Sequence, residues 1–155
     1  MKIRQYFPYM DDMTLIEYEQ PERPSEWIRN IRFEYEQQHL FILMLVDDNG
    51  ECVGAAHIIT SKDMMDSNHR FLIKKGRAYI QHLTIAPEYR HKGKGQELLN
   101  KALDYVRQKQ CTECALAVYS DDIVTRHICA KYNFVKPLLV VKTSPNYIVF
   151  TAAIA

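Results

Sequence analysis

The chain has 155 residues, 47% of them hydrophobic and 25% charged, a balance typical of one soluble globular domain (1–155) and unlike that of a disordered chain. Twenty lysines and arginines against nineteen aspartates and glutamates give a net charge of +1, which offers no global attraction to nucleic acid or to an anionic membrane. The longest apolar run, Leu40–Val46, is far shorter than the roughly 20 residues that a membrane span needs.

The first 76 residues carry alternating strand and helix signals. Acidic residues at 11 and 12 predict the cap of a helix that ends near Tyr18, ahead of breaking prolines at 21 and 24. Ser25 predicts the N-cap of a second helix, in which apolar residues recur at helical spacing. Asp47–Gly50 is a turn signal between two apolar runs and predicts a hairpin. The expected elements are a strand at 2–7, the two helices, a buried strand at 40–46, its partner at 51–60 and a polar loop at 61–76.

The second half alternates more regularly. Residues 78–86 predict a strand that stops before Pro87, and a turn with glycines then leads into a helix with one apolar face. That face consists of Leu98, Leu99, Ala102, Leu103 and Val106. The elements expected after it are a strand at 115–119, a helix at about 122–131 with Val124, His127 and Ile128 inward, and strands at 135–143 and 147–153 around a turn at 144–146. Strands interleaved with helices predict an α/β fold with a mixed sheet.

Four cysteines, at positions 52, 111, 114 and 129, lie among apolar neighbours. Reduced cysteines often pack as small hydrophobic residues. Cys111 and Cys114 form a C-x-x-C, but a four-ligand zinc site needs a second close pair, which the sequence lacks. We therefore expect buried thiols and no metal. The N-terminus has no apolar stretch of signal-peptide length, which favours a cytoplasmic protein.

Residues 83–99 combine a strand, a proline, a basic loop and a helix. Gly93 and Gly95 have no Cβ, so the backbone there can approach a ligand closely. The amides from about His91 to Gln96 would point free N–H groups outward at a helix N-terminus, an arrangement that binds phosphate. The basic side chains of the loop are Arg90, Lys92 and Lys94. These features predict a pyrophosphate cradle, although neither the P-loop nor the Rossmann glycine pattern occurs.

The pattern L-x-I-x-P-x-x-R-x-x-G-x-G, from Leu83 to Gly95, resembles the signature of the GNAT superfamily, the N-acetyltransferases that use acetyl-CoA. The segment Lys131-Tyr-Asn-Phe134 is similar to the family's closing K-x-G-F, with an asparagine, which tolerates positive φ, in place of glycine. The resemblance implies a single-domain α/β GNAT-like fold. Its mixed, mostly antiparallel sheet of about seven strands would be splayed at strands 4 and 5 and flanked by about four helices.

The resemblance also implies acetyl-CoA as the co-substrate. The loop 90–95 and the amide of Gln96 would hold the CoA pyrophosphate, and the backbone of residues 83–85 would pair with the pantetheine arm. On the helix after the fifth strand, three residues form a stripe that faces the cofactor in the family: Asp122, Thr125 and Cys129. The implied cofactor-binding residues are Leu83, Thr84, Ile85, Arg90, His91, Lys92, Gly93, Lys94, Gly95, Gln96, Asp122 and Thr125.

Acetyl transfer to an amine needs an acid that protonates the departing thiolate. The family's usual acid is a tyrosine, and Cys129 occupies its position here. A thiol with a pKa of about 8.5 is well matched to another thiol, so Cys129 is a candidate acid, unless it is a small packing residue. Tyr132 and Tyr119 are neighbouring alternatives.

The reaction also needs a base that takes a proton from the amine. Some family members carry a glutamate or histidine on the cleft face of the fourth strand. Alternation along this strand puts Tyr79 and Gln81 on that face and turns His82 away. Gln81 is therefore expected to hold a water that relays the proton. The remaining candidates for the base are Glu34, Glu36, His57 and His82.

We therefore expect an enzyme that moves an acetyl group from acetyl-CoA directly to a primary amine in a ternary complex, with a small molecule as the acceptor. The alternatives are a protein N-terminal or lysine acetyltransferase and an acyl-CoA-binding regulatory module without catalysis. The acidic and aromatic run 34–36 would attract a cationic amine. The acceptor site is expected near residues 21–24, the second helix and the final hairpin. Neither nucleic acid nor a membrane is expected as a partner, and a homodimer is left open.

Overall fold

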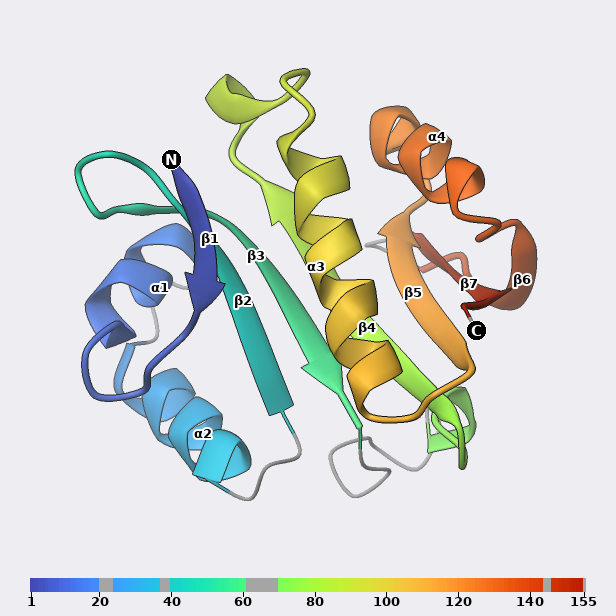
Figure 1. Ribbon diagram of the computed structural model, residues 1–155, viewed down its shortest axis with the longest axis horizontal. Coiled ribbons are helices and arrows are strands. Elements are labelled where there is room, and N and C mark those ends of the chain that lie inside the picture. Colours follow the sequence, from blue (N-terminus) through green and yellow to red (C-terminus); the bar gives the residue numbers. More distant parts are fainter. Residues whose placement is uncertain (20–23, 37–39, 61–69, 144–145, 155) are drawn as a thin grey trace.

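One mixed sheet organises the computed structural model, which describes residues 1–19, 24–36, 40–60, 70–143 and 146–154 (Figure 1). Within these ranges seven strands lie in the order β1-β2-β3-β4-β5-β7-β6. The strands are β1 (Lys2–Gln5), β2 (Leu40–Val46), β3 (Cys52–Ile59), β4 (Arg77–Ile85), β5 (Glu113–Tyr119), β6 (Lys136–Val141) and β7 (Tyr147–Ala153). All neighbouring strands are antiparallel except β4 and β5, which are parallel. This sheet confirms the predicted fold class.

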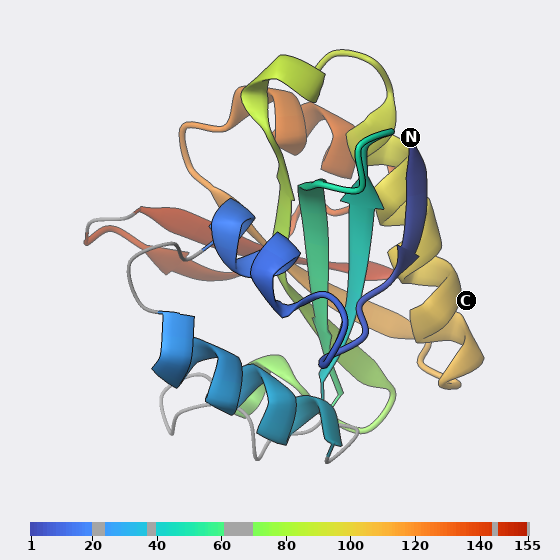
Figure 2. The ribbon, with the colours of Figure 1, turned by 90° about the vertical axis from the view of Figure 1, so that its left-hand side faces the viewer.

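Helices cover both faces of the sheet (Figure 2). The α-helices of the described residues are α1 (Asp12–Glu19), α2 (Pro24–Glu36), α3 (Lys94–Gln108) and α4 (Ile123–Lys131), and two 3-10 helices are η2 (Arg70–Leu72) and η3 (Pro87–Tyr89). Strand β2 shows how the layers pack: Leu43 and Leu45 join the core cluster under α3, whereas Ile42 and Met44 join the cluster under α1 and α2. Because side chains alternate along a strand, a strand buried on both faces is apolar throughout.

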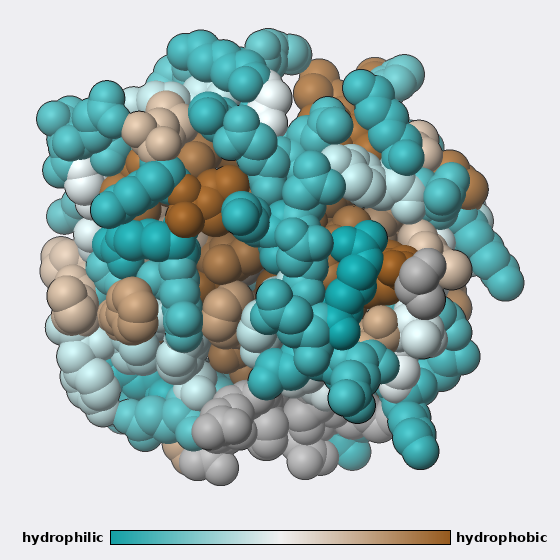
Figure 3. All heavy atoms as spheres, viewed as in Figure 1, coloured by the Kyte–Doolittle hydropathy of each residue, from teal (hydrophilic) through white to brown (hydrophobic). Residues whose placement is uncertain are grey.

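Helix α3 is the amphipathic helix that the sequence predicts. Its apolar stripe is fully buried and consists of Leu98, Leu99, Ala102, Leu103 and Val106. The surface along the helix is hydrophilic, and hydrophobic residues show on either side of it (Figure 3). Since this stripe packs on β2, β3 and β4, it fixes the N-terminus of α3 at one end of the sheet, beside the ends of β4 and β5.

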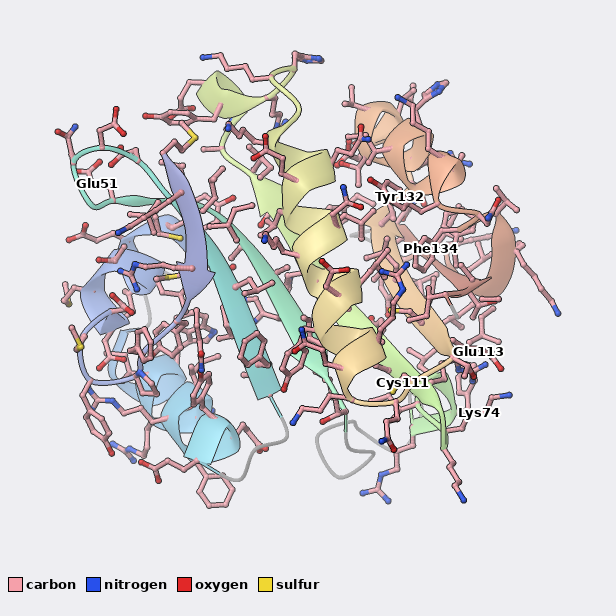
Figure 4. All side chains as sticks on the ribbon, viewed as in Figure 1. Glu51, Lys74, Cys111, Glu113, Tyr132 and Phe134 are labelled. Atoms are coloured by element: carbon pink, nitrogen blue, oxygen red, sulfur yellow. The ribbon has the colours of Figure 1, made fainter. Side chains whose placement is uncertain are left out.

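Strands β4 and β5 pair over only one half of their length. Their register joins residues 77–80 to residues 113–116. At this end the buried Arg77 donates from Nε to the Leu72 carbonyl oxygen at 2.9 Å, and its Nη1 lies 3.7 Å from Glu113. Lys74 reaches the same carboxylate at 3.5 Å, and Figure 4 shows Lys74 and Glu113 together at this end. Ion pairs of Arg77 and Lys74 with Glu113 thus lie at the paired end of β4 and β5, and the two strands separate beyond residues 80 and 116.

A β-bulge interrupts β4 where the separation begins. In the register with β3, His57 pairs with His82 and Ile58 pairs with Ile80, which leaves Gln81 as the extra residue. A bulge bends a strand and resets the alternation of its side chains. The second half of β4, residues 81–85, therefore does not present the faces that uninterrupted alternation predicts.

Most predicted elements are confirmed to within two residues, and β2 and β7 have the predicted bounds. The Asp47–Gly50 turn forms, with Gly50 at φ +83°. Helix α2 begins at Pro24, before the expected cap at Ser25. Parts of the expected loop and turn, at 61–69 and 144–145, lie outside the described residues, as do residues 20–23. Among the described helices, none has the length and apolarity to span a membrane.

The inward face predicted for α4 is wrong in part. Val124 and His127 are exposed, whereas Ile128 packs partly against the core and Cys129 is fully buried. The buried stripe is therefore displaced along the helix, because α4 meets α3 and the core with residues 128 and 129. Of the four free cysteines, Cys111 is half-buried and the other three are buried, which largely confirms their predicted packing role.

Gly54 sets how closely β3 approaches the second half of β4. A Cβ there would lie 2.7 Å from Ile85 Cδ1 and 3.0 Å from the carbonyl oxygen of Thr84. We predict that Gly54→Ala lowers the free energy of unfolding by about 1–3 kcal/mol, because overpacking forces the two strands apart. Urea denaturation measures the change.

The matched control is Gly50→Asn in the hairpin turn. Nothing lies within 4 Å of a Cβ at Gly50, and asparagine tolerates a positive φ, so its unfolding free energy should stay within about 0.5 kcal/mol of the wild-type value. An unchanged denaturation midpoint for Gly54→Ala would contradict the prediction.

Candidate functional site

Three adjoining cavities follow the opening between β4 and β5. We name them the loop cavity (about 220 Å³), lined by the loop before α3 and by α4; the gap cavity (about 190 Å³), between the two strands; and the cleft cavity (about 640 Å³), lined by α1 and α2. Thr84 and Tyr119 line all three. The splay thus connects the N-terminus of α3 with the face of the sheet that α1 and α2 cover.

The loop cavity has the features of an anion site. Gly93 adopts φ +77° and His91 adopts φ +64°, so the chain turns sharply into α3. The first bond of the helix runs from Glu97 N–H to the carbonyl oxygen of Gly93 at 3.1 Å. Helix geometry therefore leaves the amides of residues 94–96 without acceptors inside the helix, and such amides attract phosphate.

The side chains of this loop are placed by several contacts. Arg90 donates from Nε to the Ile85 carbonyl oxygen at 2.8 Å, which ties the loop to the end of β4. The ammonium of Lys92 lies 5.7 Å from the ring centre of Tyr89. The predicted residues that line the loop cavity are Leu83, Thr84, Ile85, Arg90, His91, Gly93, Lys94, Gly95, Asp122 and Thr125. Lys92 and Gln96 are not among its lining residues.

Helix α4 brings two of its three predicted stripe residues to the opening. Asp122 caps the helix, accepting the Thr125 amide at 3.0 Å and the Thr125 hydroxyl at 2.6 Å. Both residues line the loop cavity and the gap cavity. Cys129 lines none of the three cavities and is buried in the core, where burial, followed by the nearby Asp122, raises the pKa of its thiol to about 12.

Tyr132 and Tyr119, the alternative candidates for the acid, differ in position. Tyr132, at the C-terminal end of α4 close to Phe134 (Figure 4), packs partly against the core and lines none of the three cavities. Tyr119 stands at the end of β5, is 46% exposed and lines all three. Of the two tyrosines, Tyr119 is therefore the one that adjoins the three cavities.

Two histidines and a glutamate lie together in the cleft cavity. His57 on β3 is 3% exposed, and its Nε2 lies 2.8 Å and 3.0 Å from the two carboxylate oxygens of Glu19 at the end of α1. The rings of His57 and His82 are 5.1 Å apart at 73°. Burial alone would raise the pKa of the Glu19 carboxyl. The charge of His57 and its hydrogen bond outweigh this effect, so the pKa of Glu19 lies below its usual range.

The surroundings keep His82 in its neutral form. His82 is exposed to solvent in the opening; desolvation by the atoms around it, and then the neighbouring His57, lower the pKa of its imidazole, while the charge of Glu19 acts in the opposite direction. A neutral imidazole at neutral pH has a free nitrogen that can accept a proton. At neutral pH the imidazole of His82 is therefore unprotonated and free to accept a proton.

The prediction that His82 points away from the cleft is wrong. Its side chain lines both the gap cavity and the cleft cavity, as does that of Gln81. The bulge at Gln81 is the reason, because it lets two consecutive residues reach the opening. Tyr79 packs in the core cluster under α1 and α2 and lines the gap cavity, but it does not line the cleft cavity.

The walls of the cleft cavity are acidic and aromatic. Glu34 of α2 and Glu88 after β4 line it together with Tyr18 and Trp27. Glu36 points elsewhere, since it accepts the Tyr9 hydroxyl at 2.6 Å. Helix α2 thus contributes to the wall as expected, whereas the final hairpin contributes Tyr147 to the gap cavity instead.

Sequence reasoning missed Tyr18 and Glu19. They end a short helix next to residues whose placement is not described, and no local motif marks them.

Among the described residues, no group of three histidine, cysteine or acidic side chains is arranged to hold a metal ion.

Comparison with known proteins agrees with this geometry. The model of the Acetyltransferase (GNAT) family matches residues 7–134, and no curated protein matches the chain in sequence. Similar solved structures include an N-acetyltransferase of Staphylococcus aureus (14% identity, 99% of this chain and 98% of that chain, TM-score 0.74). Others are the spermidine/spermine N-acetyltransferase of Vibrio cholerae (15%, 98% and 92%, 0.73) and the PaiA N-acetyltransferase of Thermoplasma acidophilum in complex with coenzyme A (21%, 98% and 98%, 0.59). At these identities the structures share the fold, and the family match, which covers most of the chain, shows that the protein belongs to the GNAT acetyltransferase family.

Proposed function

We propose that the protein is an N-acetyltransferase that moves the acetyl group of acetyl-CoA to the primary amine of a small molecule. The observation that supports the proposal is the row of adjoining cavities, with the N-terminus of α3 at one end and His82 at the other. The Thermoplasma acidophilum structure of the same fold holds coenzyme A, which supports the choice of co-substrate.

Acetyl-CoA would enter from the loop cavity. The amides of Lys94 and Gly95, with the side chains of Arg90 and Lys94, would bind its pyrophosphate, and Lys92 and Gln96 adjoin them in the chain. Residues 81–85 of β4 are not paired with β5 in the described sheet, so backbone groups of Leu83, Thr84 and Ile85 are available to the amides of the pantetheine arm. Asp122 and Thr125 would line its path. In this arrangement the thioester reaches the gap cavity, beside Tyr119.

The amine would enter from the cleft cavity. Its ammonium gives a proton to His82, directly or through a water held by Gln81, and the freed amine nitrogen attacks the thioester carbonyl carbon. The new C–N bond forms as the C–S bond breaks. The thiolate of CoA takes a proton from an acid, for which we propose Tyr119, because this half-exposed tyrosine lines all three cavities. Attack in a ternary complex needs no covalent Cys129 intermediate.

The lining of the cleft cavity favours a cationic acceptor. Carboxylates at Glu34 and Glu88 attract positive charge, and the face of Trp27 suits an ammonium group. The Vibrio cholerae neighbour acts on spermidine and spermine by its description, so amines with a second positive charge are the first substrates to try. Four free cysteines suit the reducing cytoplasm, where we place the enzyme.

The first experiment measures CoA release from acetyl-CoA across polyamines, amino acids, aminoglycosides and peptide N-termini. We predict turnover with amines that carry a second charge, and His82→Gln should lower kcat on the order of 100-fold because the base is lost. Thermal shift with acetyl-CoA alone is the control, since a ligand at about 100 times its Kd stabilises by about 2.7 kcal/mol.

Each other outcome has a meaning. Turnover confined to peptides would establish a protein acetyltransferase. Stabilisation by acetyl-CoA without turnover of any amine would favour a regulatory module that binds acyl-CoA, and no stabilisation would overturn the cofactor assignment.

A leucine at Gly95 should block the loop cavity. A Cβ at Gly95 lies at ordinary contact distance, 3.7 Å, from Ile85 and Ile128, two residues that line this cavity. The fold therefore accepts a side chain there, while a branched one occupies the space of the cofactor. We predict that Gly95→Leu weakens acetyl-CoA binding, measured by calorimetry, at least about 10-fold, or 1.4 kcal/mol. Lys101→Leu on the exposed side of the same helix is the control and should bind as the wild type does.

The choice of acid is tested by three variants. Tyr119→Phe should lower kcat on the order of 100-fold, because the phenol that protonates the thiolate is gone. Cys129→Ala and Tyr132→Phe should retain kcat within a few-fold, since neither side chain lines the cavities. Steady-state kinetics at saturating substrates measures all three. A large loss in Cys129→Ala with unchanged melting temperature would return the acid to the thiol.

A further inference from the structure

His57 takes no part in the acetyl transfer described above, yet it contacts both His82 and Glu19. It lies opposite His82 in the register of β3 with β4, and the two rings meet edge to face at 5.1 Å. On its other side, Nε2 lies within 3.0 Å of both oxygens of Glu19. The pairing of β3 with β4 thus places His57 beside His82, and Glu19 of α1 holds the His57 ring by a hydrogen bond.

The chemistry of this contact determines the orientation of the ring. The pKa of the Glu19 carboxyl lies below its usual range, so the group is an ionised carboxylate, which only accepts hydrogen bonds. Nε2 of His57 must therefore carry the hydrogen that it donates to Glu19. The carboxylate of Glu19 therefore fixes the orientation of the His57 ring. The ring of His82 packs against the ring held in this orientation.

We propose that His57, clamped by Glu19, is a positioning residue that holds the ring of His82 toward the cleft and sets the pH range in which His82 accepts the proton of the amine. The proposal rests on the proposed function, in which His82 is the base. The proton passes from the ammonium to His82 and is then released to solvent, and neither His57 nor Glu19 gains or loses a bond.

The charges of the pair act on His82 in opposite directions. The pKa of His82 is lowered first by burial and then by His57, and it is raised by Glu19. Other ionisable groups also face this part of the opening: Tyr18 from α1, Glu34 from α2, Tyr79 from β4, Glu88 and Arg90 after β4, Tyr119 from β5, Asp122 before α4 and Tyr147 from β7. The two members of the pair are the charged groups that act most strongly on His82.

A purely structural pair would behave differently. The ion pair of Arg4 with Asp11, at 2.7 Å, holds β1 to the start of α1 and lies outside the three cavities. Removing a charge from such a pair lowers stability and leaves the titration of His82 unchanged. Only a pair coupled to His82 shifts that titration, with a sign that depends on which charge is removed.

The experiment is an NMR titration of the His82 ring in the ligand-free protein. His57→Gln retains a donor for Glu19 and removes the positive neighbour, so the midpoint of His82 should rise by about half a pH unit or more. Glu19→Gln removes the negative charge, so the midpoint should fall. Asp11→Asn is the matched control: it should lower the melting temperature and leave the midpoint in place.

Unchanged midpoints in both variants, or shifts in the same direction, would overturn the proposal. If His57→Gln does not fold, Glu19→Gln decides alone, since a structural pair predicts no displacement. The acid limb of the pH profile of kcat should move with the midpoint in each variant. Because the titration needs no turnover, opposite shifts in a protein that acetylates no amine would leave the coupling standing and refute the proposed function instead.

Discussion

The short parallel pairing of β4 with β5 is the constraint on which the rest of the site depends. Four residues of each strand are joined at the end that Arg77 and Glu113 fasten, and the bulge at Gln81 bends β4 beyond that end. The separation exposes backbone edges and opens the gap cavity. It also joins a cavity beside α3 and α4 to a cavity under α1 and α2 on the other face of the sheet.

Burial governs the chemistry within this opening. In the core beside the opening, burial raises the pKa of the Cys129 thiol to about 12, because a low-dielectric site disfavours an anionic thiolate. At the opening itself, desolvation and then His57 lower the pKa of His82, because both disfavour a cationic imidazolium. Cys129 is thereby a poor acid, and the imidazole of His82 is unprotonated at physiological pH. Pairing with a histidine allows Glu19 to stay ionised although it is largely buried. Such a pair contributes little net stability, which makes a functional role the better reason for its presence.

The sequence predicts correctly those elements whose signals lie within a short stretch of the chain. The apolar runs of β2 and β7 and the stripe of α3 each report burial directly, and the glycines of the loop before α3 report its sharp turn. The site residues that were missed depend on longer-range geometry. Glu19 meets His57 across 38 positions of sequence, and the bulge that brings His82 to the cleft adds one residue to a strand whose pattern looks regular. Cys129 was misplaced because the packing of α4, which its weak amphipathicity does not specify, decides which residues face inward.

Direct transfer, as proposed, requires both substrates to occupy the opening together, one on each side of the splayed strands. Initial velocities over a grid of acetyl-CoA and amine concentrations test it most directly. Direct transfer in a ternary complex predicts double-reciprocal lines that intersect, with dead-end inhibition by a CoA analogue that is competitive against acetyl-CoA. Parallel lines, with an acetylated enzyme that forms in the absence of amine, would contradict the claim and place a covalent intermediate on the protein.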